Sequence, residues 1–228
     1  MKFTVLPQSK LAWLRFTLIT IVTPILYMVY SLNVNLVAVS SLIRYSPQQG
    51  DIIFQSLSHN DLTDAIEGIT DSPYSHCGIV LQNNGKWYVR EAISTVHDTP
   101  LTMWVLRGRK TNHAVYRLKS EYHSLIPKFL EETKKYLGRG YDIHYSFTNR
   151  HIYCSELVFN AWNDLNATLP TQDLQLMGKV MELGEMNWKP HEKTIRNIEY
   201  GKLPLDRRMI TPKHLAEADQ LTLVTSTY

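Results

Sequence analysis

Cysteine is scarce in this chain of 228 residues, which contains only Cys77 and Cys154. Two cysteines cannot by themselves form a structural zinc site, and neither stands where a lipoprotein anchor would need it. No Cys-x-x-Cys or His-x-x-x-His pair occurs. One disulfide is arithmetically allowed if the domain lies outside the cytoplasm, but it would consume both thiols. Each of the two thiols is therefore a candidate for a chemical role of its own.

Clustered positive charge is also missing. The net charge is +3, and no run of Lys and Arg is longer than two residues. A nucleic-acid-binding surface needs such clusters, so the sequence indicates no nucleic-acid partner. No internal repeat occurs. The hydrophobic content of 44% and charged content of 20% are typical of a globular protein, and the length suits one domain with an N-terminal appendage.

Charged residues are absent from residues 16–43, and Lys2, Lys10 and Arg15 precede that stretch. About 20 apolar residues cross a bilayer, and basic residues hold the preceding end in the cytoplasm. We therefore expect residues 1–44 to form a cytoplasmic N-terminus and a transmembrane helix. Residues 45–228 would then form a domain outside the cytoplasm, attached to the cell membrane by a single pass and facing the periplasm.

Two other interpretations of this stretch stay open. A cleaved signal peptide would use a site near Ser40, in Ala38-Val39-Ser40, and would release the domain to the periplasm or the medium. Signal peptides usually have an apolar region of about 7–15 residues, so the greater length here favours an uncleaved anchor. A buried core helix is the third interpretation.

The strongest chemical signal comes from two short segments. Cys154 precedes Leu157, Val158, Ala161 and Trp162, whose spacing predicts a helix that begins near the cysteine. Unpaired N–H groups and the helix dipole at that end lower the pKa of a thiol. His76 lies in SHCGIV (residues 75–80), a pattern that predicts a strand. Such a strand could hold the imidazole of His76 against the end of the helix.

The hairpin after His76 indicates a third candidate for the catalytic site. If Asn84-Gly85 forms a two-residue turn, Gly78 faces Glu91. Glu91 would then lie diagonally across from His76 on the same face and could orient the imidazole. Side chains alternate along a strand, so Cys77 points to the opposite face from His76. This favours Cys77 as a small buried hydrophobic residue over a second catalytic thiol or a disulfide partner.

The remaining patterns predict strands and helices in a mixed order. We expect strands near residues 50–55, 76–82, 86–93, 114–118 and 221–225, and helices near 58–70, 100–104, 124–137, 154–162 and 211–218. Asn60 is the expected cap of the first of these helices, and residues 168–205 match no clear pattern. A small antiparallel sheet with segregated helices is an α+β fold.

Several segments in this order resemble the YiiX/YebB-like family, the permuted branch of the NlpC-type cysteine peptidase superfamily. They are GDIIF (50–54), SHCGIV (75–80), VREA (89–92), LGRGYD (137–142), YCSELV (153–158), ITPKHL (210–215) and LTLV (221–224). The resemblance covers about residues 48–225 and implies a permuted papain-like fold, in which the histidine strand precedes the cysteine helix. The sequence departs from the family pattern at Cys77, where a small aliphatic residue is usual, and in residues 168–205.

The resemblance also implies roles for individual residues. Cys154 would be the nucleophile, His76 the general base and Glu91 the orienting residue of a hydrolase that forms a thioacyl-enzyme. The expected bond is a peptide or cell-wall amide, or an acyl bond in a lipid. Tyr141, Asp142 and Tyr153 are the expected cleft-lining, substrate-binding residues, although Tyr141-Asp142 could instead cap a turn. No metal, cofactor or obligate protein partner is implied.

Three alternatives remain at this point. The domain could be an acyltransferase acting on lipids, or a membrane-tethered binding domain without catalysis. His144 and His151, with Cys154 and His76, could form a metal-binding or redox module, although the usual ligand spacings are missing. We expect Glu156, in the first turn of the predicted helix, to be a carboxylate favoured by the helix dipole rather than a proton-transfer group.

Overall fold

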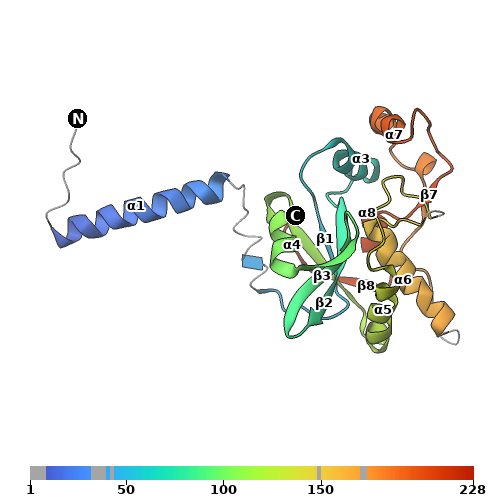
Figure 1. Cartoon of the computed structure of the whole chain (residues 1–228), viewed down its shortest axis with the longest axis horizontal. Helices are drawn as coiled ribbons and strands as arrows, with labels where there is room; N and C mark the ends of the chain where they lie inside the picture. The colour runs from blue at the N-terminus through green and yellow to red at the C-terminus, as the bar shows by residue number, and fades with distance from the viewer. Residues whose placement is uncertain (1–8, 32–39, 42–43, 148–149, 170–173) are drawn as a thin grey trace.

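The computed structural model describes residues 9–31, 40–41, 44–147, 150–169 and 174–228. Helix α1 (Lys10–Ser31) extends away from the other elements, which pack together around one sheet (Figure 1). The elements from β1 onward therefore contain the features that position a functional site.

No helix in the described ranges is both long enough and apolar enough to cross a membrane. The transmembrane helix predicted within residues 16–43 is not found among the described residues of that stretch. Residues 32–39 and 42–43, which include Ala38 and Val39 of the predicted cleavage site, lie outside the described residues.

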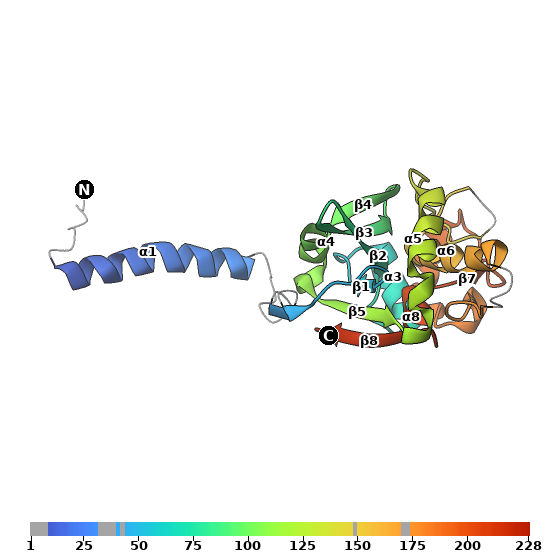
Figure 2. The same ribbon diagram turned by 90° about the horizontal axis from the view of Figure 1, so that it is seen from below.

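A six-stranded sheet has the strand order β4-β3-β2-β1-β5-β8, and each neighbouring pair is antiparallel. Figure 2 shows β8 beside β5 at one edge. The strands are β1 (Ile52–Gln55), β2 (His76–Asn83), β3 (Lys86–Ala92), β4 (Val96–Pro100), β5 (His113–Leu118) and β8 (Leu221–Ser226). A second sheet pairs β6 (Met181–Glu182) with β7 (Arg208–Met209). The predicted α+β class with an antiparallel sheet is confirmed.

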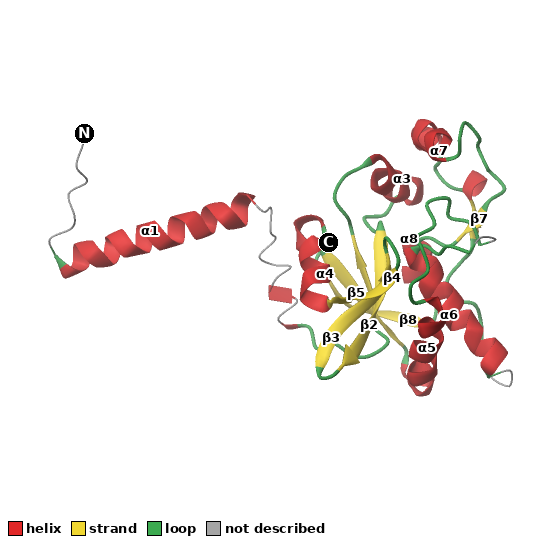
Figure 3. Ribbon diagram, viewed as in Figure 1, coloured by secondary structure: helices red, strands yellow, loops and turns green. Residues whose placement is uncertain are grey.

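Some helices pack on the two faces of this sheet, and others pack on neighbouring helices. These helices are α3 (Asp61–Thr70), α4 (Leu101–Arg107), α5 (Ile126–Thr133), α6 (Cys154–Thr168), α7 (Glu192–Ile198) and α8 (Pro212–Ala216). Short 3-10 helices cover Arg109–Thr111, Ser120–Leu125, Lys134–Tyr136, Leu183–Glu185 and Lys189–His191. Figure 3 shows the sheet between α4 on one side and α5 with α6 on the other. The helix predicted over residues 124–137 is thus divided into α5 and two flanking 3-10 segments.

The β2–β3 hairpin has the predicted register. Asn83 pairs with Lys86, and both turn residues have positive φ, 48° at Asn84 and 73° at Gly85, as a type I′ turn requires. The pairing continues through Ile79 and Arg90, so that Gly78 faces Glu91 one step further along.

Alternation along β2 assigns its side chains to two cores. Cys77 and Ile79 belong to the larger core, together with Leu157 and Val158 of α6. Val80 belongs to a smaller core with Trp104 of α4. Helix α6 packs on β2 and belongs to the larger core, with Cys77 and Ile79.

Candidate active site

Cys154 is the first residue of helix α6, and Tyr153 is the N-cap residue. The side chains of Leu157, Val158 and Trp162 are fully buried, which anchors this end of the helix against the sheet. The first N–H groups of a helix have no partner within it, and they lie at the positive end of its dipole. Cys154 is 1% exposed, so these donors act on its sulfur with little screening from water.

The structure brings His76 and Glu91 together as the hairpin register predicts. The Nε2–H of His76 donates to Glu91 Oε2 at 2.6 Å, and both side chains are buried. The His76 ring stacks against Trp104, with ring centroids 5.8 Å apart. The other ring nitrogen, Nδ1, is left for Cys154, with which the His76 side chain is also hydrogen-bonded.

Three further donors hold the Glu91 carboxylate. Trp104 Nε1–H donates to Oε2 at 2.9 Å, Thr99 Oγ1–H donates to Oε1 at 2.6 Å, and Arg107 forms an ion pair with Oε2. Burial alone would raise the pKa of Glu91, but the hydrogen bond and charge of His76, followed by Arg107 and Thr99, lower the pKa to about 2. Glu91 is therefore a fixed negative charge behind the imidazole. Sequence reasoning missed all three of these donors.

The charges of the neighbours set the ionisation of the Cys154–His76 pair. Burial opposes a charged imidazole, but contact with Cys154 and then with Glu91 raises the pKa of His76 to about 9. A hydrogen bond from the Cys77 side chain lowers the pKa of Cys154, and His76 adds to the effect against the opposing influence of burial. A thiolate next to an imidazolium is the ionised form of a cysteine nucleophile and its base.

Cys77 lies on the face opposite His76, as the alternation predicts, and it is fully buried. That face is the one on which α6 packs, so Cys77 contacts Cys154. Its side chain and its backbone both act on Cys154 and lower the pKa of the Cys154 thiol. Burial is the largest cause that raises the pKa of Cys77 well above the ordinary value, which keeps it a thiol. The expectation that Cys77 is only a packing residue therefore misses its contact with the nucleophile.

The predicted substrate-binding residues have three different placements. Tyr141 O–H lies 2.8 Å from the Tyr145 hydroxyl oxygen. Burial, then the charges of Tyr145 and Cys154, raise the pKa of Tyr141 well above its ordinary value. The Asp142 carboxylate accepts from the backbone N–H groups of His144 and Ser146 at 2.9 and 2.7 Å, so it caps a turn.

Tyr153 contributes to the core instead of a cleft. Its side chain is fully buried, and its hydroxyl accepts the backbone N–H of Ile210 at 3.1 Å. Its ring packs on that of Tyr145, with centroids 4.8 Å apart. The sequence could not show this, because the direction of the residue before a helix depends on what packs above it.

Glu156 does not behave as the helix dipole alone predicts. Its carboxylate accepts from Tyr153 N–H at 3.3 Å and from Asn160 Nδ2–H at 3.2 Å. Burial, with a smaller contribution from the charge of Asp142, nevertheless raises its pKa to about 7. Only 3% of the residue is exposed, so loss of hydration outweighs the favourable dipole.

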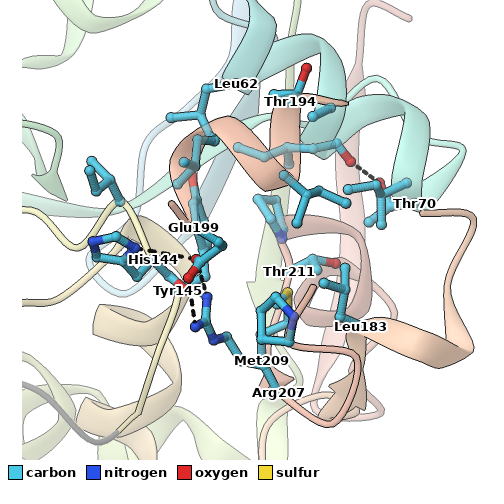
Figure 4. A pocket seen from close by; sticks show the side chains of 18 residues that line it. Leu62, Thr70, His144, Tyr145, Leu183, Thr194, Glu199, Arg207, Met209 and Thr211 are labelled. Carbon is cyan, nitrogen blue, oxygen red and sulfur yellow. Dashed lines mark hydrogen bonds and ion pairs between the residues drawn. The ribbon is translucent and has the colours of Figure 1, made fainter. Parts of the chain in front are cut away.

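An apolar pocket lies next to the tyrosine pair. It encloses about 620 Å³ of space, its solvent-open mouth included, and Tyr145 forms part of its wall (Figure 4). Its apolar walls come from segments far apart in the sequence and include Leu62, Ile66, Ile69, Ile195, Ile198 and Met209. Residues 183–209, most of which lie in the stretch that sequence patterns left unassigned, supply much of this lining.

One side of the pocket is charged. Arg207 pairs with Glu199, with an Nη2–Oε2 distance of 2.9 Å, and His144 Nδ1 lies 3.2 Å from Glu199 Oε1 (Figure 4). His144 therefore faces Glu199. Among the residues that the structure describes, no group of three or more His, Cys, Asp or Glu side chains could hold a metal ion. His144, His151 and Cys154 thus do not gather into such a group among the described residues.

Comparisons with known proteins agree with this architecture. Residues 46–225 match the model of the family described as permuted papain-like amidase enzymes, YaeF/YiiX. An uncharacterized protein YiiX of Escherichia coli (strain K12) is 33% identical over 183 residues, which cover 79% of this chain and 87% of that protein. A crystal structure of the metalloprotein YiiX from Escherichia coli O157:H7 is 32% identical with a TM-score of 0.70. It covers 81% of this chain and 99% of that one. The chain thus belongs to the YaeF/YiiX family of permuted papain-like amidases.

Proposed function

We propose that this protein is a cysteine hydrolase in which Cys154 attacks an acyl carbon, His76 transfers the proton and Glu91 positions the imidazole. Membership of an amidase family supports the reaction class. The observation that carries the residue assignment is the continuous chain of contacts from Cys154 through His76 to the four-donor carboxylate of Glu91. A buried carboxylate with this many partners cannot turn away, so the imidazole keeps one orientation.

In the proposed reaction, the Cys154 thiolate adds to the carbonyl carbon and forms a tetrahedral intermediate. The backbone N–H of Cys154, at the start of α6, is a donor for the developing oxyanion, and such a donor contributes roughly 3 kcal/mol to lowering the barrier. The His76 imidazolium then gives its proton to the leaving amine or alkoxide. Water, activated by the neutral imidazole, finally releases the acyl group from the thioester.

The apolar pocket suggests what the acyl group is. Tyr145 borders the pocket and also lies close enough to Cys154 for the thiolate charge to raise its pKa, after the larger effect of burial. An acyl group bound to the sulfur could therefore extend past Tyr145 between α3 and α7. We propose an amide or ester of a long, apolar carboxylic acid, rather than a polar cell-wall peptide, as the substrate.

The test measures hydrolysis of nitrophenyl esters and anilides with two-, eight- and sixteen-carbon acyl chains by the full chain. Cys154→Ala and His76→Ala should each lower kcat/KM by at least about 1,000-fold. His59→Gln is the matched histidine control, because that side chain is 69% exposed and bonds to Asp64. Retained activity in Cys154→Ala would refute the covalent mechanism.

A second variant tests the acyl group. Ala65 is 4% exposed and lines the pocket, so Ala65→Phe should obstruct it. We expect the long-chain ester to lose most of its kcat/KM while the acetyl ester keeps its own. Equal losses for both esters would contradict the assignment of the pocket. Transfer of the acyl group to an added alcohol or amine would indicate an acyltransferase, and electrophile binding without turnover would indicate a binding domain.

Membrane association through residues 16–43 and a periplasmic location are also proposed. Large apolar side chains of α1 are exposed, among them Leu18, Ile19, Ile25 and Leu26. Exposed apolar surface of this extent favours contact with lipid or another apolar partner. Recovery of the full chain in the membrane fraction after a carbonate wash would support this proposal, and recovery in the soluble fraction would contradict it.

A further inference from the structure

The buried pair of thiols at the tip of α6 has a chemistry that hydrolysis does not use. Cys77 and Cys154 are 0% and 1% exposed, and both are free. Each side chain acts on the ionisation of the other, and both lie in the core cluster where α6 packs on β2. Hydrolysis needs only one sulfur. A second sulfur beside the nucleophile needs a separate explanation.

The two sulfurs differ in reactivity because their surroundings differ. Cys154 lies at a helix N-terminus next to His76, which favours the thiolate. Cys77 lies within the apolar face of β2, paired with Phe54 on the neighbouring strand and in the same core cluster as Leu157, which favours the neutral thiol. An oxidant therefore reacts first at Cys154, and Cys77 is placed to respond.

From this geometry we infer that Cys77 is a resolving thiol, which condenses with oxidised Cys154 to form a reversible intramolecular disulfide. The oxidant class is a hydroperoxide. This inference goes beyond the proposed hydrolase function and depends only on the reactivity of the Cys154 sulfur, so it can hold even if the substrate assignment fails.

The chemistry proceeds in two balanced steps. The Cys154 thiolate attacks one peroxide oxygen, the S–O bond forms, the O–O bond breaks, and the leaving oxygen takes a proton from His76 to depart as water or an alcohol. Sulfur is oxidised by two electrons and the peroxide is reduced by two. Cys77 sulfur then attacks Cys154 sulfur. The S–S bond forms, the S–O bond breaks, and the Cys77 proton leaves with the hydroxyl group as a second molecule of water.

The result would be a protected, inactive state of the nucleophile. Without a resolving thiol, a sulfenic acid is oxidised further to sulfinic and sulfonic acids, which thiols do not reverse. The disulfide has a sulfur–sulfur bond of about 2.05 Å, so the two sulfurs must move together by rotation about their side-chain bonds. A thiol reductant then restores both cysteines.

The experiment treats the full chain with hydrogen peroxide and follows intact mass, peptide mapping and labelling of Cys154 by iodoacetamide. The wild type should lose the mass of two hydrogen atoms, yield a linked peptide pair containing Cys77 and Cys154, and lose labelling completely. Dithiothreitol should return the labelling in full. In Cys77→Val, the same peroxide dose should add oxygen atoms to Cys154, and dithiothreitol should return little or none of the labelling.

Cys77→Ser repeats the test with a polar side chain of similar size, and thermal melting identifies any variant that has not folded. Cys154→Ser controls for oxidation at Cys77, and its Cys77 should stay reduced at that dose. Stepwise oxidation of wild-type Cys154 without a Cys77–Cys154 link would overturn the inference. So would equal recovery of the wild type and both Cys77 variants. Neither outcome depends on ester or amide hydrolysis, so failure here is distinguishable from failure of the proposed function.

Discussion

Glu156 offers a quantitative test of how the tip of α6 is buried, through the substitution Glu156→Gln. The glutamine keeps the shape of the side chain and an oxygen that can accept from Tyr153 N–H, but it cannot ionise. Burial raises the pKa of Glu156 from 4.5 to about 7. The difference of about 2.5 between the two pKa values corresponds to about 3 kcal/mol, at 1.36 kcal/mol for each factor of ten.

The sign of the effect follows from which state releases its proton first. Below pH 4.5 the carboxyl group is protonated in both the folded and the unfolded chain, and its full contribution to stability is present. Between pH 4.5 and 7 the unfolded chain ionises first, so the folded state loses stability as the pH rises. Above pH 7 both states are ionised and the loss is complete. Glu156→Gln avoids this loss.

Urea unfolding of both proteins at pH 4, 6 and 8 measures the difference in the free energy of unfolding. We expect the two proteins to be nearly equal at pH 4 and the variant to be more stable by about 3 kcal/mol at pH 8. Glu121→Gln removes one negative charge from an exposed position and serves as the matched control. A difference that does not grow with pH, or a less stable variant at pH 8, would refute the reasoning.

Three other substitutions test the contacts around the imidazole. Glu91→Gln removes the charge that helps to hold the pKa of His76 near 9, so the alkaline limb of the pH profile of kcat/KM should move to lower pH. An unchanged alkaline limb would contradict the effect of Glu91 on the pKa of His76. Trp104→Phe keeps the stacking but removes a donor to a buried carboxylate, and urea unfolding should show a loss of about 1.5–3 kcal/mol. Gly78→Ala places a methyl carbon 2.4 Å from Val89 Cγ1, and unfolding should show a loss of about 1–3 kcal/mol, whereas an unchanged midpoint would contradict this packing.

Local rules predicted the parts of the fold that depend on neighbours in sequence. The Asn60 side chain caps α3 by accepting from Leu62 N–H and Thr63 N–H, because an asparagine oxygen in that position meets free helix donors. The Asn84-Gly85 turn fixes the register of the hairpin, and this register brings Glu91 into contact with His76. Both features are decided within about fifteen residues of chain.

Features that depend on distant segments could not be predicted in this way. The apolar pocket needs Leu62 from α3 and Ile195 from α7, and no local pattern brings these helices together. The donors that surround Glu91 come from β4 and α4, and their direction depends on how α4 folds back over the sheet. Tyr153 and Glu156 have short-range signals that favour exposed roles, but burial under neighbouring segments reverses them.

The contact between the two cysteines shows why correct local geometry can still lead to an incomplete conclusion. His76 and Cys77 point to opposite faces of β2, as alternation requires, and from this one expects a single thiol near the imidazole. Both residues lie at the start of the strand, however, where α6 also begins, so a sulfur at the helix tip reaches around the strand end to both. Any side chain at position 77 therefore forms part of the nucleophile's surroundings. Its polarity and its capacity to donate a hydrogen bond affect how readily Cys154 ionises, although it lies outside the Cys–His–Glu set.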